Sequence, residues 1–333
     1  MADKFISAQQ IFLEQVKQKA NPVIPLVDQL ADALHVSNDG AYRRLRGTTV
    51  LTLDEAVALA EHFSLPLPEI KNLKTEGFVF QRSTFRETLD DFGEYVKKTE
   101  IYLTQIRDSK QKFGIYAAKD IPVFYFFHFP ELASFKMYFW LKTLKGGSDI
   151  KSKKFSFDSV PKEYFDKAKS VAKLYAQIPF TELWNEETIN STLNQIQYFA
   201  DANLFDKKQT GIMLCDKLQE LFEVIQLQAE TGLKYFKGEK MKPDVPYELY
   251  FNDLIALDNT IYTRTESFEM TMVSYNAMDY LFTFNPIIGH EVLQFLETQK
   301  SKSQVISKSS EKERNKFFKR IEEKISLLKT KFS

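Results

Sequence analysis

Three arginines occur within four positions of the chain, at Arg43, Arg44 and Arg46, in the segment NDGAYRRLRG of residues 38–47. A guanidinium group is planar and carries five N–H donors, so it can donate two parallel hydrogen bonds to a carboxylate, a phosphate or a guanine edge. The other polar side chains of this cluster are Ser37, Asn38, Asp39, Tyr42, Thr48 and Thr49. The cluster predicts recognition of a hydrogen-bonding surface rather than bond-breaking chemistry.

The sequence lacks the usual signatures of catalysis and of metal binding. His290-Glu291 begins an H-E-x-x-H pattern, but Gln294 stands where the second histidine would be. Cys215 lies within an apolar helical pattern, which predicts a core thiol rather than a nucleophile. No Walker loop, G-x-G-x-x-G or G-x-S-x-G motif is present. We therefore expect a protein that is not an enzyme and has no metal and no cofactor. An aromatic pocket with converging, perturbed ionisable groups would argue against this expectation.

The length, charge and glycine content of the chain limit the possible domain number and fold class. A chain of 333 residues corresponds to about two or three domains. Lys and Arg equal Asp and Glu at 45 each, so the whole chain has no basic excess for nucleic acid, although residues 300–333 hold eleven Lys or Arg and four Glu. Only 11 residues are glycine, which favours helices over Gly-rich loops.

The sequence also indicates a compartment. The N-terminus has no long apolar run typical of a secretory signal, and the longest apolar run, near residues 123–129, is far too short for a membrane helix. A single cysteine fits a reducing compartment. We expect a soluble cytoplasmic protein without a membrane partner.

The elements that position the arginines are predicted to be four helices. Apolar residues recur at helical spacing over residues 5–20, 26–34, 38–46 and 52–63. Ser37 or Asn38 is placed to cap the third helix, and Gly47 is placed to end it. Thr52 and Glu55 form a capping-box pattern for the fourth helix. Two short helices joined by a tight turn, followed by a support helix, have the layout of a helix-turn-helix.

Residues 26–63 resemble the lambda-repressor-like (Cro/C1-type) DNA-binding family through the segments LADALHVS, NDGAYRRLRG and TLDEAVALAEHF. The resemblance covers about residues 5–70 and implies that the second helix lies in the major groove of double-stranded DNA. It also implies that Ala31 lets the two helices approach and that Val36 plugs the turn. His35 occupies the turn position that is usually glycine, so a left-handed conformation there has a cost.

Two registers of the second helix are open. An ungapped match buries Ala41 and Arg44, whereas a turn longer by one residue buries Tyr42 and Leu45. Arg43 faces outward in both registers, as do Asn38 and Asp39, so Arg43 is the best candidate for a contact to a base.

The residues after the second helix favour DNA binding, whereas the net charge of this region does not. Thr48 and Thr49 follow the helix and are placed to contact phosphate. Residues 1–75 hold eight Lys or Arg and nine Asp or Glu, a net charge of −1, although DNA-binding domains are usually basic. A protein-interaction module is therefore the alternative.

The whole chain looks like a group of bacterial transcriptional regulators that join such a helix-turn-helix to a long, mainly helical C-terminal region. We expect a mainly α fold with a helix-turn-helix domain at 1–75, a helical connecting or dimerisation region at 76–148, and a mainly helical sensor or interaction domain at 149–333. Segments 247–254, 260–265 and 268–275 alternate like strands and predict a small three-stranded antiparallel sheet near 247–275.

Two further segments have a functional and a structural interpretation. Residues 123–140 contain nine aromatics in 18 positions, which predicts a hydrophobic core in preference to a ligand pocket or dimer interface. Residues 308–331 are basic and amphipathic, which predicts a packed helix with a solvated face in preference to contacts with DNA.

The sequence thus predicts a DNA-binding transcriptional regulator that forms a homodimer, with a scaffold protein as the alternative. The abundant Tyr and Phe of the C-terminal region also suit a small apolar or aromatic effector. An enclosed cavity of about 300 Å³ or more, lined by these aromatics and a few inward polar groups, would support that effector. The alternative is that these residues form only a packed dimerisation core.

Overall fold

The structure is a computed structural model that describes residues 7–20, 24–63, 65, 78–82, 88–144, 154–238, 245–254, 258–275 and 279–332. The chain divides into two compact units, Met1–Val79 and Phe80–Ser333, called here the N-terminal and C-terminal units. Each has a hydrophobic core of its own. The domain boundaries expected at 75/76 and 148/149 lie outside the described residues.

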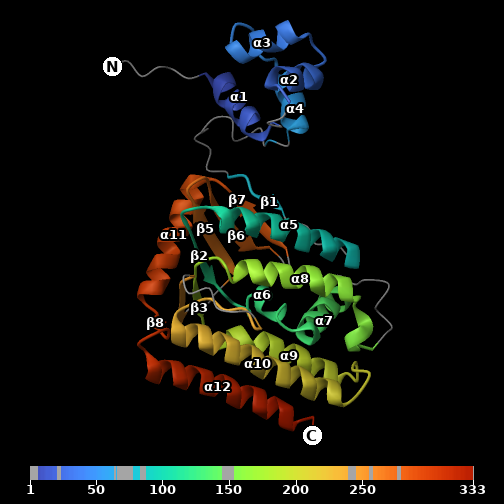
Figure 1. Cartoon of the computed structure of the whole chain (residues 1–333), viewed down its shortest axis with the longest axis vertical. Helices are drawn as coiled ribbons and strands as arrows, with labels where there is room; N and C mark the ends of the chain where they lie inside the picture. Colours follow the sequence, from blue (N-terminus) through green and yellow to red (C-terminus); the bar gives the residue numbers. More distant parts are fainter. Residues whose placement is uncertain are drawn as a thin grey trace. The chain divides into compact units, whose positions relative to one another are not determined.

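The N-terminal unit contains four described helices (Figure 1), which are α1 (Ala8–Lys19), α2 (Leu26–Leu34), α3 (Asn38–Arg46) and α4 (Leu53–His62). Their core is built from apolar residues of all four helices, among them Phe12, Leu30, Ala31, Ala41 and Leu59. The predicted capping box at Thr52 and Glu55 is confirmed.

Two left-handed residues shape the turns on either side of α3. Gly47 ends the helix with a φ of 76°, as predicted. His35 ends α2 with a φ of 52°, a conformation that costs a residue with a Cβ about 1–2 kcal/mol. The turn therefore keeps its geometry without the usual glycine.

The C-terminal unit is organised around an eight-stranded mixed sheet with the strand order β1-β7-β6-β5-β2-β3-β4-β8. Its strands are β1 (Gln81–Arg82), β2 (Lys112–Ala117), β3 (Phe180–Trp184), β4 (Tyr247–Phe251), β5 (Thr260–Thr265), β6 (Glu269–Ser274), β7 (Tyr280–Thr283) and β8 (Gln304–Val305). The pairs β2–β3 and β3–β4 are parallel, and all other neighbours are antiparallel.

The mainly α fold with a small three-stranded sheet near 247–275 is therefore wrong, and the fold is mixed α/β. The three predicted strands exist as β4, β5 and β6, but β2 and β3 lie between β5 and β4. The error has a physical reason. Central parallel strands are covered on both faces, so their sequences lack the alternation that reveals a half-exposed strand.

Helices cover both faces of this sheet (Figure 1). They are α5 (Leu89–Asp108), α6 (Val123–Phe126), α7 (Pro130–Phe139), α8 (Lys162–Tyr175), α9 (Glu187–Asp201), α10 (Gln209–Thr231), α11 (Pro286–Ser301) and α12 (Glu311–Thr330), with a short π-helical segment at Trp140–Leu144 and a 3-10 turn at Phe157–Ser159. On one face Leu296 of α11 packs on Ile115 and Ala117 of β2. Tyr116, between these two residues, points into the larger core on the other face.

Two structural expectations concern the packing of this unit. The aromatic side chains of residues 123–140 are buried and belong to the larger core, but Phe124, Phe126, Phe139 and Trp140 also line the cavities described below, so the preference for a core over a pocket is met only in part. Phe317, Phe318, Ile321, Ile325 and Leu328 of the basic C-terminal segment are buried, so α12 is a packed helix. None of the described helices is both long and apolar enough to cross a membrane.

Candidate functional site

The outward face of α3 is formed by Asp39, Tyr42, Arg43 and Arg46, which we call the α3 surface. Positions i, i+3, i+4 and i+7 share one face of a helix. The side chains of Asp39 and Arg43 are 67% and 61% exposed, and Tyr42 is 47% exposed. Ala41 on the opposite face is fully buried, so the helix has the ungapped register.

Both arginines of the α3 surface are held by exposed side chains of the same helix. Arg43 forms an ion pair with Asp39, in which Nε donates to Oδ2 over 2.9 Å. The guanidinium of Arg46 lies 5.1 Å from the centre of the Tyr42 ring. Exposed ion pairs contribute only about 0–1 kcal/mol, so Arg43 can exchange Asp39 for another acceptor at little cost.

Arg44 is placed differently and links α3 to α4. Its side chain is only 16% exposed, and Nε donates to Oε2 of Glu55 over 3.0 Å. Hydrogen bonding within this pair raises the pKa of Arg44 and lowers the pKa of Glu55. Arg44 therefore positions the helix, while Arg43 and Arg46 are the arginines at its surface.

The remaining predicted residues fix the two ends of α3. The Ser37 hydroxyl accepts the backbone N–H of Gly40, and Asn38 Nδ2 donates to Asp28 Oδ1 over 2.8 Å. Thr48 is exposed, and its hydroxyl donates to the Arg43 carbonyl over 3.0 Å. Thr49 is half-buried.

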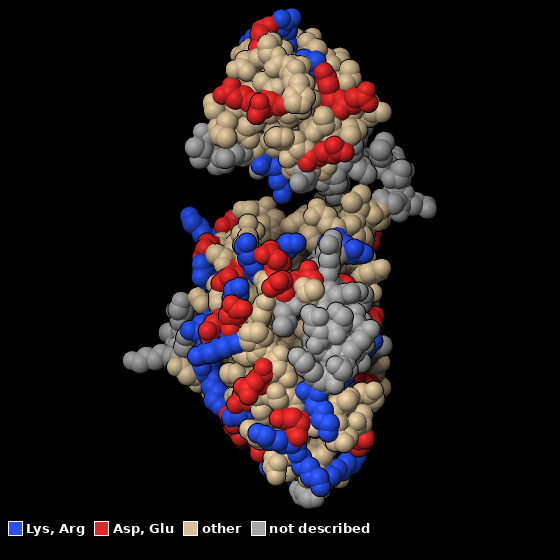
Figure 2. Space-filling model, turned by 90° about the vertical axis from the view of Figure 1, so that its right-hand side faces the viewer, with Lys and Arg blue, Asp and Glu red and all other residues tan. Residues whose placement is uncertain are grey.

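Gln9 of α1 is a positioning residue that the sequence interpretation missed. Its Nε2 donates to the carbonyls of Arg44 and Thr49, both over 2.9 Å, and its Oε1 accepts the Leu51 N–H over 3.0 Å. These bonds hold the loop that follows α3. Figure 2 shows acidic and basic side chains together on the visible face of the N-terminal unit.

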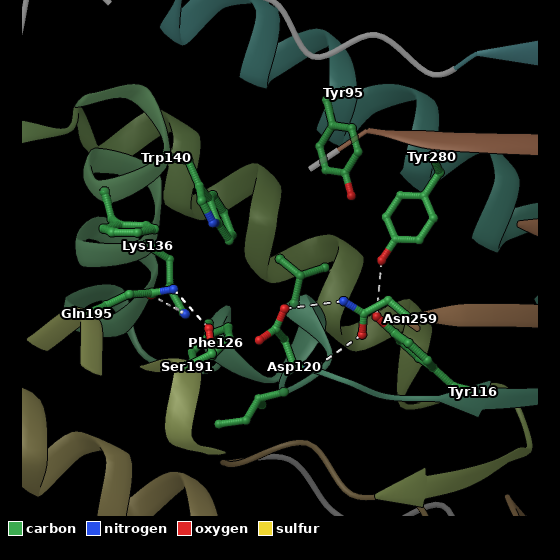
Figure 3. Close-up of a pocket in the computed structure, with 13 residues that line it drawn as sticks. Tyr95, Tyr116, Asp120, Phe126, Lys136, Trp140, Ser191, Gln195, Asn259 and Tyr280 are labelled. Carbon is green, nitrogen blue, oxygen red and sulfur yellow. Dashed lines mark hydrogen bonds between the residues drawn. The ribbon is translucent and has the colours of Figure 1, made fainter. Parts of the chain in front are cut away.

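The C-terminal unit contains two adjoining cavities near the carboxyl end of β2. The polar chamber has a volume of about 190 Å³ and is lined in part by Asp120, Lys136, Trp140, Ser191, Gln195 and Asn259 (Figure 3). The apolar chamber has a volume of about 390 Å³ and is lined in part by Tyr102, Phe124, Phe180, Met270, Met272 and Phe282. Tyr95, Tyr116, Val123 and Tyr280 line both.

Lys136 brings a buried ammonium group to the polar chamber. The residue is only 3% exposed, and Nζ donates to Thr192 Oγ1 over 2.9 Å and to Gln195 Oε1 over 2.7 Å. Burial lowers the pKa of Lys136 to about 8, and the charge of Asp120 opposes this shift. The ammonium is thus held by two neutral acceptors.

Asp120 is the carboxylate of the same chamber. Asn259 pairs with it twice, since the Asp120 N–H donates to Asn259 Oδ1 over 3.1 Å and Asn259 Nδ2 donates to Asp120 Oδ2 over 3.3 Å. Beside this pair the hydroxyls of Tyr116 and Tyr280 lie 3.2 Å apart at the border of the two chambers.

Glu182 and Lys234 form a second buried charged group, which is separate from the chambers. Both side chains are fully buried, and Nζ lies 3.0 Å from Glu182 Oε1. The carboxylate also accepts bonds from the side chains of Tyr125, Tyr175, Tyr247 and Trp184. Because every oxygen is satisfied and sealed from solvent, this cluster is structural.

The polar chamber meets part of the condition set above for an enzyme, because aromatic walls surround an amine with a shifted pKa. Its hydrogen-bond partners are neutral, however, so the amine is not paired with a base or an acid. No group of three His, Cys, Asp or Glu side chains able to hold a metal ion occurs in the described part of the chain.

Comparison with known proteins identifies no relative. No protein-family model, no curated protein and no solved structure matches the chain significantly.

Proposed function

We propose that the chain is a cytoplasmic, sequence-specific DNA-binding regulator of transcription that has no enzymatic activity. The observation that carries this proposal is the α3 surface, an exposed helix face with two arginines on the second helix of a helix-turn-helix. Arg43 and Arg46 lie one turn apart on this face, and the guanidinium of an arginine can donate two hydrogen bonds to the edge of a guanine in the major groove.

A homodimer is part of this proposal, because one helix-turn-helix covers few base pairs and a two-fold dimer doubles the site. The aromatic side chains of residues 123–140 lie in the core, so we expect the contact between subunits to use other residues of the C-terminal unit. Light scattering of the full chain is expected to give about twice the chain mass of 38.8 kDa. A monomer at tens of micromolar would contradict the dimer.

The test of DNA recognition is selection of bound sites from a random pool of double-stranded DNA with the full chain. Arg43→Ala is expected to weaken binding to the selected site by about 1–3 kcal/mol, because a bidentate base contact is lost. Arg107→Ala is the matched control, since Arg107 pairs with Asp108 on α5 of the C-terminal unit. Equal affinity of wild type and Arg43→Ala for the selected site would contradict the proposed base contact.

A scaffold that binds protein through the N-terminal unit is the alternative function. Val50 and Leu53, which follow α3, are 76% and 77% exposed, and apolar side chains of this kind suit a protein partner. Salt dependence separates the two functions, because binding to phosphates weakens steeply as salt rises. Failure to select any DNA site would favour the scaffold.

A further inference from the structure

We propose that the two chambers of the C-terminal unit bind one amphipathic carboxylate, with its apolar or aromatic body in the apolar chamber and its carboxylate head on Lys136. This binding does not depend on the proposed DNA-binding function. Only its role as an effector rests on that function.

The two chambers are continuous in their lining. Tyr95, Tyr116, Val123 and Tyr280 line both, so the chambers adjoin, and the hydroxyls of Tyr116 and Tyr280 lie at their border. The proposed ligand passes this border, with its head in one chamber and its body in the other. Figure 3 shows Tyr95 and Tyr280 on one side of the polar chamber and Lys136 and Gln195 on the opposite side.

The volume and lining of the apolar chamber define the ligand body. Pockets for small organic ligands span about 300–1,000 Å³, and this chamber has about 390 Å³ with few polar groups. Its walls hold water poorly, because buried water needs several polar partners. Met270 and Met272 have flexible, polarizable side chains that adapt to ring systems or acyl chains.

The charges of the lining define the head. Lys136 is buried between two neutral acceptors, and its Nζ also lies 4.5 Å from the centre of the Phe126 ring. A ring face is a weaker partner for an ammonium than a carboxylate, so a ligand carboxylate can take the third N–H donor. Arg82 and Lys98 add two exposed cations to the apolar chamber, whereas Asp120 is the one carboxylate that lines either chamber among the described residues. This excess of positive charge favours an anion, and a carboxylate on an ammonium forms a strong charge-assisted bond.

Substitution of Asp120 tests whether the head of the ligand is negatively charged. It repels an anionic head, so Asp120→Asn is expected to strengthen binding of a carboxylate severalfold. A cationic or zwitterionic head would instead lose its partner in this variant and bind more weakly.

The experiment titrates the full-length protein with three probes that share one aromatic body, namely 1-pyrenebutyrate, its primary amide and 1-pyrenebutanol, and follows pyrene fluorescence. The carboxylate is expected to bind at least about 10-fold more tightly than the amide or the alcohol, since a hydrogen bond to a charged group contributes about 1.5–3 kcal/mol. Equal binding of all three probes, or no binding of the carboxylate, would overturn the proposal. This comparison uses the wild-type protein and does not depend on how any variant folds.

Two lysine variants locate the head. Lys136→Met is expected to reduce carboxylate affinity about 10-fold or more while alcohol binding stays the same. Lys97→Met, the same change at an exposed lysine of α5 that lines neither chamber, is expected to leave carboxylate affinity within about twofold. Retention of carboxylate affinity in Lys136→Met would overturn the placement of the head. Because no DNA is present, failure of the DNA-binding proposal leaves these results unaffected.

Discussion

At the residue scale, the Glu182–Lys234 pair is the most demanding feature of the C-terminal unit. Two opposite charges share a fully buried site with three tyrosines and a tryptophan. Burial lowers the pKa of Lys234, while the nearby Glu182 carboxylate opposes that shift. The carboxylate is therefore what permits a charged lysine in this core.

Glu182→Gln is expected to lower the free energy of unfolding of the C-terminal unit by about 3–5 kcal/mol, because it leaves a buried charge without its counter-charge. Urea unfolding followed by tryptophan fluorescence measures this loss. Glu248→Gln on β4 is the control, since Glu248 is only half-buried and its bond from the Thr181 hydroxyl is 3.3 Å long. A loss below about 1 kcal/mol for Glu182→Gln would show that the cluster tolerates an uncompensated lysine.

The sequence indicates that some charged residues of this unit have buried partners, but it does not identify those partners. Lys136 is the one Lys or Arg of the aromatic segment 123–140, and Glu182 is the one charged residue of the apolar run FTELW. A lone charge in an apolar segment indicates a partner, because unpaired buried charges are strongly disfavoured. The partners Thr192 and Lys234 lie 56 and 52 residues farther along the chain, so only the fold reveals them.

At the element scale, local signals predicted the helices of the N-terminal unit well. The cap at Ser37, the left-handed Gly47 and the capping box at Thr52 each act within a few residues, so the sequence contains the whole interaction. The register of α3 could be assigned only from the fold, because burial of Ala41 rather than Tyr42 depends on how α3 packs on α2 and the core of the N-terminal unit. Whether Arg44 can contact a ligand could also be decided only from the fold, since its partner Glu55 lies on α4.

The strands show the opposite case. β2 pairs with residues 180–183 of β3 and with residues 260–265 of β5, both distant in sequence. The reason for glycine at position 114 could not be predicted from the sequence. Gly114 faces Phe180 across this pairing, and a Cβ there would overlap the Phe180 ring. A glycine that weakens a strand on its own is thus required by a partner more than sixty residues away.

At the scale of the whole molecule, the two units have separate cores of very different size. The core of the N-terminal unit is a small cluster around Phe12, Leu30 and Leu59, whereas that of the C-terminal unit extends over both faces of the sheet. Small domains bury a smaller fraction of their surface and are correspondingly less stable. We therefore expect the N-terminal unit to unfold first and on its own.

The two tryptophans make this expectation measurable, because Trp140 and Trp184 both lie in the C-terminal unit. In a urea titration, helical circular dichroism reports on both units and tryptophan fluorescence reports on the C-terminal unit alone. Leu30→Ala removes a fully buried side chain and is expected to destabilise the N-terminal unit by about 2–5 kcal/mol. It should move the early part of the dichroism curve to lower urea and leave the fluorescence midpoint in place. Glu182→Gln should shift the fluorescence midpoint and leave the early dichroism change unaltered. A single transition, seen identically by both probes and shifted by both variants, would mean that the two units unfold as one cooperative structure.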